Sequence, residues 1–461
     1  MKVKNLFKSG GSSISIIFLF LSLLSLVVTA SIFFINSMFD IFPKSLPSGE
    51  LINSNLIYEL MINNRNFLFI YASIFFLTIY LVPRLTGRVF IGMKPATLLA
   101  VLVFGIIIIS PYLSYESKNN YGIPYNLSLA LLLLLTLFVL IASINFIKKA
   151  EESLFISGYF LLASLISLVA SAYAAQINLQ TTADLIIINS FFTSLHFYMG
   201  CGFASLCIIF FLATKGIGGT LENNSLAYIT LWGYLFLLPW VSFKFYFGSF
   251  LPNWLENISI YMSLGLIVPL IAFLSNIIKT LQSSEEDRGT IYRYLNYSVY
   301  FFTFGNILLI LGGVPSLISL VSFTFWDEAI VWSFLLSLAS GMLGVCFYTI
   351  PKLMGREYRD EKISQYLYLI GSTLLVISLA SKGIVSGYMW TAGANAGTFT
   401  TFGEGYALTW QAISQFNYLS TLGIAILIIS ILTFLFNTFR AITSGEVVAQ
   451  EVLTGVVGNN E

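Results

Sequence analysis

Apolar stretches long enough to cross a lipid bilayer recur along this entire chain. Crossing about 30 Å of hydrocarbon takes about 20 helical residues. Twelve stretches meet this length, approximately at 13–37, 66–83, 96–115, 126–147, 153–176, 186–213, 226–249, 258–280, 294–321, 329–350, 365–389 and 417–439. They leave no room for a soluble domain, so residues 1–461 are predicted to form a single all-α polytopic membrane domain. The composition agrees, because 57% of the residues are hydrophobic and only 9% are charged.

The distribution of lysine and arginine predicts the orientation, since positively charged loops stay in the cytoplasm. With both termini inside, 17 of the 22 basic residues fall on the cytoplasmic side, at positions 2, 4, 8, 84, 88, 94, 148, 149, 215, 279, 288, 293, 352, 356, 359, 362 and 440. We therefore expect twelve spans with both termini cytoplasmic. The glycine-rich segment 390–416 is expected to be external, either as an ordered loop over the outer face or as a flexible linker.

Charge and sulfur content exclude several classes of function. A net charge of +1 offers no basic field, so nucleic acid is not an expected partner. Cys201, Cys207 and Cys346 lie in apolar runs without CxxC spacing, so we expect inert packing residues. His196 is the only histidine of the chain, which excludes any site that needs several imidazole ligands.

Three motifs in the last third of the chain are specific enough to suggest a family. They are Tyr348-Thr349-Ile350-Pro351-Lys352-Leu353-Met354-Gly355-Arg356-Glu357, Gly383-Ile384-Val385-Ser386-Gly387-Tyr388-Met389-Trp390 and Phe436-Asn437-Thr438-Phe439-Arg440. Trp240 and Leu251-Pro252-Asn253-Trp254 add to them. Together they resemble the ends of helices ten, eleven, twelve and seven in subunit I of the C-type (cbb-type) heme-copper oxidases. The resemblance implies that family's twelve-helix bundle, a prokaryotic inner membrane, and membrane subunits as partners, among them a membrane-anchored c-type cytochrome.

The metal ligands that the resemblance implies are missing from this chain. Lys244-Phe245 stands where the family has two adjacent copper histidines, and Leu238 stands at its redox tyrosine. Residues 327–332 carry no histidine where helix ten should hold a His-x-His pair, Met61–Asn64 lie near the heme ligand of helix two, and Leu308 lies near a glutamate of helix nine. Only His196 matches a family ligand, the first copper histidine.

One imidazole cannot supply a copper centre and a bis-imidazole heme, so we expect no cofactor in this chain. A b-type heme between Met61 and His196 is the alternative, and a structural core histidine is the simpler role for His196. Interiors pack without large voids, so aromatic side chains such as Phe243, Phe245, Tyr246, Phe247 and Phe250 are expected to fill the space of the cofactors, unless lipid or quinone occupies a former heme pocket.

A lysine at the copper position needs a partner, because a charge in hydrocarbon costs about 2.5–3.5 kcal/mol on insertion scales. Lys382 is a second internal cation, and Asp327 and Glu328 begin helix ten on the same outer side. We therefore predict a buried charge cluster of Lys244, Lys382, Asp327 and Glu328. Snorkelling of both lysines to the outer interface is the competing prediction.

Three functions are compatible with these observations. The first is a cofactor-free homologue of oxidase subunit I that serves as a structural subunit of a respiratory or electron-transfer complex and is no enzyme on its own. The second is an ion or proton transporter that uses the same bundle. The third is a redox-active oxidase or nitric oxide reductase subunit with unusual heme ligation.

Overall fold

The fold is an all-helical bundle in the computed structural model. It describes residues 10–41, 67–86, 90–110, 125–147, 155–177, 181–283, 289–355, 362–395 and 402–444. Met61 lies outside the described residues, as does most of the segment between the first two predicted spans.

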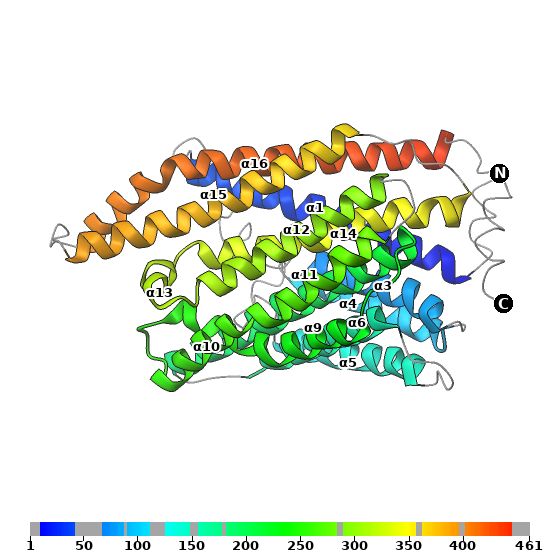
Figure 1. The fold of residues 1–461 in the computed structure, drawn as a ribbon, viewed down its shortest axis with the longest axis horizontal. Helices are drawn as coiled ribbons and strands as arrows, with labels where there is room; N and C mark the ends of the chain where they lie inside the picture. Colours follow the sequence, from blue (N-terminus) through cyan, green and yellow to red (C-terminus); the bar gives the residue numbers. More distant parts are fainter. Residues whose placement is uncertain are drawn as a thin grey trace.

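Apolar helices match all twelve predicted stretches (Figure 1). Eleven helical runs within the described residues are long enough to span a membrane, and α4 is a shorter apolar helix. The bounds are α1 Gly10–Ile41, α3 Phe69–Thr86, α4 Met93–Ile109, α5 Tyr125–Ile147, α6 Ile156–Ala174, α7 Thr182–Thr193, η4 Ser194–Cys201, α8 Gly202–Phe211, η5 Leu212–Gly216, α9 Asn224–Leu237, η6 Leu238–Tyr246, α10 Asn253–Gly265, α11 Ile267–Gln282, α12 Thr290–Leu311, α13 Pro315–Val321, α14 Trp326–Met354, α15 Lys362–Asn395 and α16 Phe402–Ser444.

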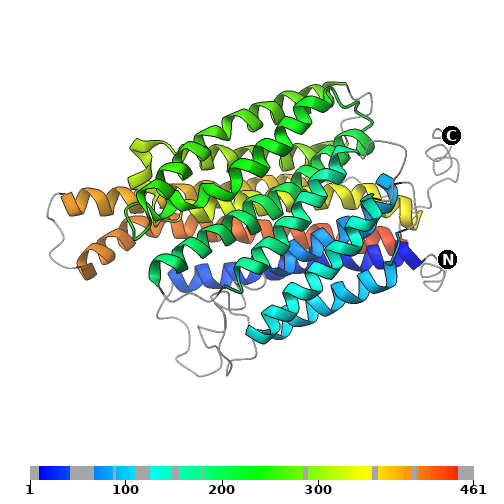
Figure 2. The same cartoon turned by 90° about the horizontal axis from the view of Figure 1, so that it is seen from below.

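Three runs form the centre of the bundle. In an apolar 18-residue stretch of the span Thr182–Gly216, which joins α7, η4, α8 and η5, 94% of the residues are buried within the protein, and the same holds for Trp326–Leu353 of α14. The corresponding share is 89% for the α3 span and only 28% for the α5 span, which lies at the edge of the bundle (Figure 2). Helices α3, α7–α8 and α14 are therefore the ones that the rest of the bundle covers most completely.

Helices α15 and α16 form a long antiparallel pair that corrects one expectation. The segment 390–416 was expected to be a loop, but α15 continues to Asn395 and α16 begins at Phe402. At 1.5 Å per residue the 43 residues of α16 extend about 65 Å, well beyond the hydrocarbon core. Both views show the pair projecting past the other helices at the end opposite the start of α1 (Figures 1 and 2).

Glycines allow these two helices to cross closely. A Cβ atom on Gly371 would lie 2.7 Å from the backbone nitrogen of Leu427, and one on Gly423 would lie 2.7 Å from that of Leu375. Small residues at a helix crossing let backbones approach, as is common between membrane helices. The start of α1 and the end of α16 lie at the same end of the bundle (Figure 1), as an even number of spans requires.

Candidate functional site

Lys244 lies on a tight turn that interrupts the seventh span. Helix α9 changes at Leu238 into the 3₁₀ helix η6, with a proline at its first turn. The end of η6 is held by three hydrogen bonds: the Lys244 amide donates to Ser259 Oγ at 2.9 Å, Ser322 Oγ donates to the Lys244 carbonyl at 3.1 Å, and the Phe323 amide donates to the Phe245 carbonyl at 3.0 Å. These bonds direct the Lys244 side chain into the bundle.

The Lys244 ammonium is fully buried and bound to neutral oxygen atoms. Its Nζ donates to Ser263 Oγ at 2.8 Å and to the carbonyl oxygen of Leu309. Among the described residues no carboxylate forms an ion pair with it, so the predicted direct pairing with Asp327 or Glu328 is wrong. Snorkelling is also wrong, since the side chain has no exposed surface.

The other three charges of the predicted cluster are oriented differently. Asp327 accepts a hydrogen bond from the Tyr198 hydroxyl, and Glu328 Oε1 accepts one at 3.0 Å from Trp332 Nε1, one turn along its own helix. Lys382 is 3% exposed and places its Nζ 3.6 Å from the centroid of the Phe325 ring. Lys244 therefore faces α10 and α12, whereas Lys382 faces the segment before α14.

Buried hydroxyl groups connect the surroundings of His196 with those of Lys244. Ser194 Oγ donates to Ser242 Oγ at 2.8 Å, and Tyr198 reaches Asp327 from the same helix η4. Sequence analysis missed Tyr198, Ser242 and Ser263. Tyr198 follows His196 by two residues, but one histidine gave no reason to examine its neighbours.

His196 lies in a wide helical turn and is surrounded by aromatic rings. The π-helix η4 carries it, and Ser171 Oγ lies 3.1 Å from its Nδ1. Phe192 stacks on the imidazole with centroids 4.9 Å apart, and the rings of Phe67, Tyr71 and Phe197 lie within 5.7 Å. The imidazole is completely buried. This environment fits a structural core histidine.

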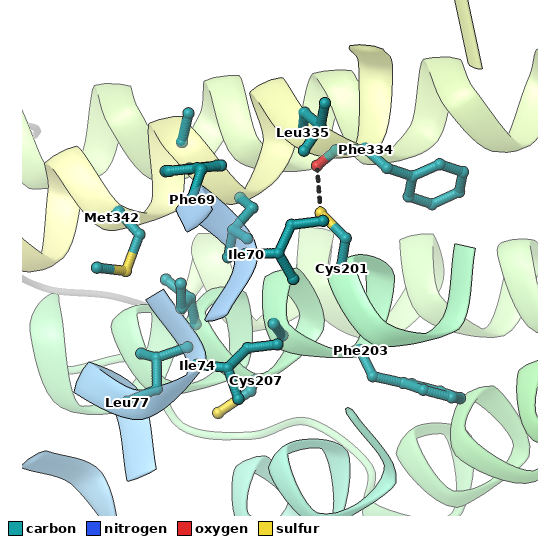
Figure 3. Close-up of a cluster of buried hydrophobic side chains, with 14 of the residues drawn as sticks. Phe69, Ile70, Ile74, Leu77, Cys201, Phe203, Cys207, Phe334, Leu335 and Met342 are labelled. Atoms are coloured by element: carbon teal, nitrogen blue, oxygen red, sulfur yellow. Dashed lines mark hydrogen bonds between the residues drawn. The ribbon is translucent and has the colours of Figure 1, made fainter. Parts of the chain in front are cut away.

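Side chains occupy the region between the helices that carry the family's heme ligands. Phe69, Ile70 and Ile74 of α3 pack toward Cys201 of η4 and Leu335 of α14 (Figure 3). Cys201 Sγ donates to the carbonyl oxygen of Phe334 at 3.2 Å, and all three cysteines are buried and free, as expected. Phe33 of α1 packs against Trp332 with centroids 4.9 Å apart.

Aromatic filling near Lys244 is confirmed only in part. Phe243 and Phe245 are buried, and Phe243 packs edge-on against Phe191 at 4.9 Å. Phe247 and Phe250 are 38% and 76% exposed, so they fill no internal space. They follow the end of η6, in the segment that leads to α10.

The described positions that match the family's metal ligands carry no imidazole apart from His196. No group of three or more potential metal-ligating side chains occurs within the described ranges. At the copper position an ammonium and a phenyl ring replace two imidazoles, and neither donates a lone pair to a metal. Leu238 and Leu308 are buried aliphatic residues.

Comparisons with known proteins identify relatives of this chain. The model of the family described as cytochrome c and quinol oxidase polypeptide I matches residues 13–426. The cbb3-type cytochrome c oxidase subunit CcoN1 of Stutzerimonas stutzeri is 23% identical over 257 residues, which are 54% of this chain and 53% of that protein. The bacteroid cytochrome c oxidase subunit 1 homolog of Bradyrhizobium diazoefficiens is 21% identical over 359 residues, which are 73% of this chain and 64% of that protein.

The fold is also shared with a solved structure. A heme-copper terminal oxidase dimer determined by cryo-electron microscopy superposes with a TM-score of 0.71 at 12% identity, covering 95% of this chain and 85% of the other. The curated relatives match over only part of their lengths, about half in the case of CcoN1.

Proposed function

Because this chain belongs to the cytochrome c and quinol oxidase polypeptide I family, we propose that it is a subunit I homologue that works without heme or copper. Its role is structural: it forms an integral membrane subunit of a respiratory or electron-transfer complex and is no enzyme on its own. The chain retains the family's sequence motifs at the ends of its helices. At positions where the family binds metal, other side chains replace the ligands.

The environment of Lys244 gives the main support for this proposal. Its ammonium occupies the copper-ligand position and is bound by Ser263 and by the Leu309 carbonyl. A primary amine whose hydrogens are bound by two oxygen atoms does not replace the two imidazoles of a copper centre, which supports the proposal. His196 adds support, since aromatic rings surround the imidazole and Ser171 lies at its Nδ1.

The partners follow from the relatives, which are named as oxidase subunits. We infer other membrane subunits, with a membrane-anchored c-type cytochrome among them, in a prokaryotic inner membrane. Long helices such as α15 and α16 supply a large lateral surface for such neighbours.

Purification of the native complex through a tag on this chain tests the proposal. We expect a c-type cytochrome subunit to co-purify, and we expect pyridine hemochrome and metal analysis of the separated chain to give neither heme b nor copper in stoichiometric amount. Stoichiometric heme bound to this chain would overturn the proposal and would direct attention to His196 and Met61.

Proton or ion transport is the second candidate, and the buried polar groups favour it. Ser194 donates to Ser242, which precedes Lys244 by two residues, and Tyr198 donates to Asp327. Reconstitution into proteoliposomes with a trapped pH dye tests this function. Transport requires a proton flux that Asp327→Asn abolishes, and equal leak in both proteins and in empty vesicles argues against it.

A further inference from the structure

Three basic residues end the three most buried spans of the bundle. Arg84, Lys215 and Lys352 each lie in the last turn of one span, at the ends of α3, η5 and α14. These are the second, sixth and tenth spans, so they end on the same side as α16, the twelfth. We call these three residues the central basic cluster.

Contacts between the three spans bring these ends together. The rings of Phe211 and Tyr348 meet edge-on with centroids 5.4 Å apart, and a Cβ atom on Gly344 would lie 3.0 Å from the side chain of Leu212. Tyr80 and Tyr348 interact electrostatically. Each cation follows one of these three aromatic residues by four positions, and so lies about one turn closer to the end of its span.

Two of the cations rest on aromatic rings of their own helices. The Arg84 guanidinium carbon lies 3.7 Å from the centroid of Tyr80, and its Nη1 donates to the Tyr80 carbonyl at 2.9 Å. The Lys352 ammonium lies 3.7 Å from the centroid of Tyr348. Cation–π contacts hold both charges in place without neutralising them. All three cations of the cluster are exposed.

None of the three cations has an acidic partner among the described residues. At the same end of the less buried α10–α11 run, in contrast, Lys279 pairs with Glu222 at 3.2 Å. A helix dipole favours a cation at each C-terminus, which accounts for single charges but not for three of them without a counter-charge. The central basic cluster therefore offers a surface for an anionic partner.

The central position of the cluster favours an acidic polypeptide over lipid headgroups as this partner. The spans that carry it are covered by the other helices, so their ends lie away from the lipid that surrounds the bundle. Anionic headgroups attract basic residues mainly within a Debye length, about 8 Å at physiological salt.

Residues 445–461 supply the opposite charge at this end of the bundle. They contain Glu446, Glu451 and Glu461 but no lysine or arginine, so three negative charges stand against the three positive charges of the cluster. They follow Ser444, where α16 ends. The connecting segments 284–288 and 356–361 also contain carboxylates, but each mixes them with arginine.

The length of this segment is sufficient to reach the cluster. Helix α16 packs against α1 and α15, which pack against α3 and α14 in turn. The cluster thus lies two helix spacings away, or about 20 Å. At about 3.3 Å per residue, Glu451 can lie up to about 23 Å from Ser444 and Glu461 up to about 56 Å, whereas Glu446 is limited to about 7 Å.

We propose that residues 445–461 dock on the central basic cluster, with Glu451 and Glu461 as the charges that bind Arg84, Lys215 and Lys352. The docked segment covers the centre of this face, and an acidic segment of another protein would have to displace it. This docking involves one chain alone and is independent of the proposed structural role.

Carbodiimide cross-linking of the purified full chain in detergent tests this docking. The reagent activates a carboxylate, which then forms an amide with a lysine amine in contact with it. At low salt we expect cross-linked peptides that join 445–461 to Lys215 or Lys352, and about 0.5 M NaCl should suppress them by screening. The pair Lys279–Glu222 serves as the internal positive control.

Charge variants that remove no cross-linking group make the test specific. Arg84→Gln should lower the yield about fivefold, the upper range for one exposed ion pair. Lys94→Gln is the matched control, because Lys94 is an exposed cation at the start of the edge helix α4. It should leave the yield unchanged, as should Glu446→Gln, and melting curves should show that all variants are folded.

Several outcomes would overturn the proposal. They are absence of cross-links to 445–461 while Lys279 and Glu222 are joined, cluster lysines joined to 284–288 or 356–361 in its place, and a yield that Arg84→Gln does not change. A mixture of isotopically labelled and unlabelled chains that gives only mixed products would assign the contact to two copies. Cross-links that vanish in nanodiscs with anionic phospholipid would assign the cluster to headgroups.

Discussion

At the scale of single residues, Lys244 shows how a charge can be stabilised in the interior without an opposite charge beside it. A serine hydroxyl and a main-chain carbonyl provide hydrogen bonds to the ammonium, and each bond to a charged group contributes about 1.5–3 kcal/mol. Desolvation of the ammonium works against this stabilisation. Because these two effects oppose each other, mutation of the lysine and mutation of its serine partner are expected to change the free energy of unfolding by different amounts.

Ser263→Ala is expected to destabilise the protein more than Lys244→Met. The first change leaves a buried ammonium with one partner fewer and should cost about 1–3 kcal/mol. The second removes the charge and fills the space with an apolar side chain, which is often neutral or stabilising. Thermal unfolding in detergent measures both.

Ser205→Ala is the matched control for the serine change, since its hydroxyl donates to the Cys201 carbonyl one turn earlier and binds no charged group. It should shift unfolding by less than Ser263→Ala. The combination of Lys244→Met with Ser263→Ala should show coupling above about 0.5 kcal/mol, the usual limit for independent sites. A greater loss from Lys244→Met than from Ser263→Ala would mean that the ammonium has a role beyond these hydrogen bonds.

His196→Asn tests whether the remaining imidazole is structural. Asparagine can bond Ser171 but loses the stack on Phe192, so we expect a loss of about 1–3 kcal/mol in unfolding free energy and no change in assembly. The electron-transfer rate of the native complex is the second measurement. Loss of that rate at normal subunit content would show that His196 takes part in chemistry.

At the scale of helices, the crossing of α15 and α16 depends on two glycines that face each other. A Cβ atom on Gly371 would lie 2.8 Å from the Gly423 carbonyl oxygen, and this neighbour is backbone that cannot rotate away. Separation of the helices would also disturb Ser430, which donates to the Ser364 carbonyl at 2.6 Å.

Gly371→Ala and Gly423→Ala should therefore each destabilise the chain by about 3 kcal/mol, the upper range for overpacking. Gly105→Ala is the control, because a Cβ atom there meets nothing within 4 Å and alanine favours helix. Melting temperature and the yield of monodisperse protein report the effect. Equal behaviour of the three variants would contradict the close crossing.

At the scale of the whole molecule, the orientation in the membrane can be tested with two cysteines at opposite ends of one span. Asn253→Cys begins the run Asn253–Gln282 and Ser283→Cys follows its end, and both positions are exposed. With both termini cytoplasmic, a membrane-impermeant maleimide should label Asn253→Cys in intact cells and Ser283→Cys only after lysis. The three native cysteines are buried and should give no background. The reverse labelling pattern would show that the chain has the opposite orientation in the membrane.

The membrane class and the family can both be predicted from the sequence alone. Twelve apolar stretches and three motifs predict them directly, because the need to satisfy backbone groups in lipid leaves few architectures, and helix-end patterns are local in sequence. It also predicted which metal ligands are missing, since that requires only the identity of residues such as Lys244 and Leu238.

The hydrogen-bond partners of Lys244, in contrast, depend on how the folded helices pack. Ser263 and Leu309 come from two other helices, and their contact with Lys244 depends on the 3₁₀ turn of η6, which no local pattern specified. Opposite charges suggested an ion pair, but Asp327 accepts a hydrogen bond from Tyr198. A buried polar atom needs a hydrogen-bond partner, whether or not that partner carries an opposite charge. Which partner lies within hydrogen-bond distance depends on the folded structure.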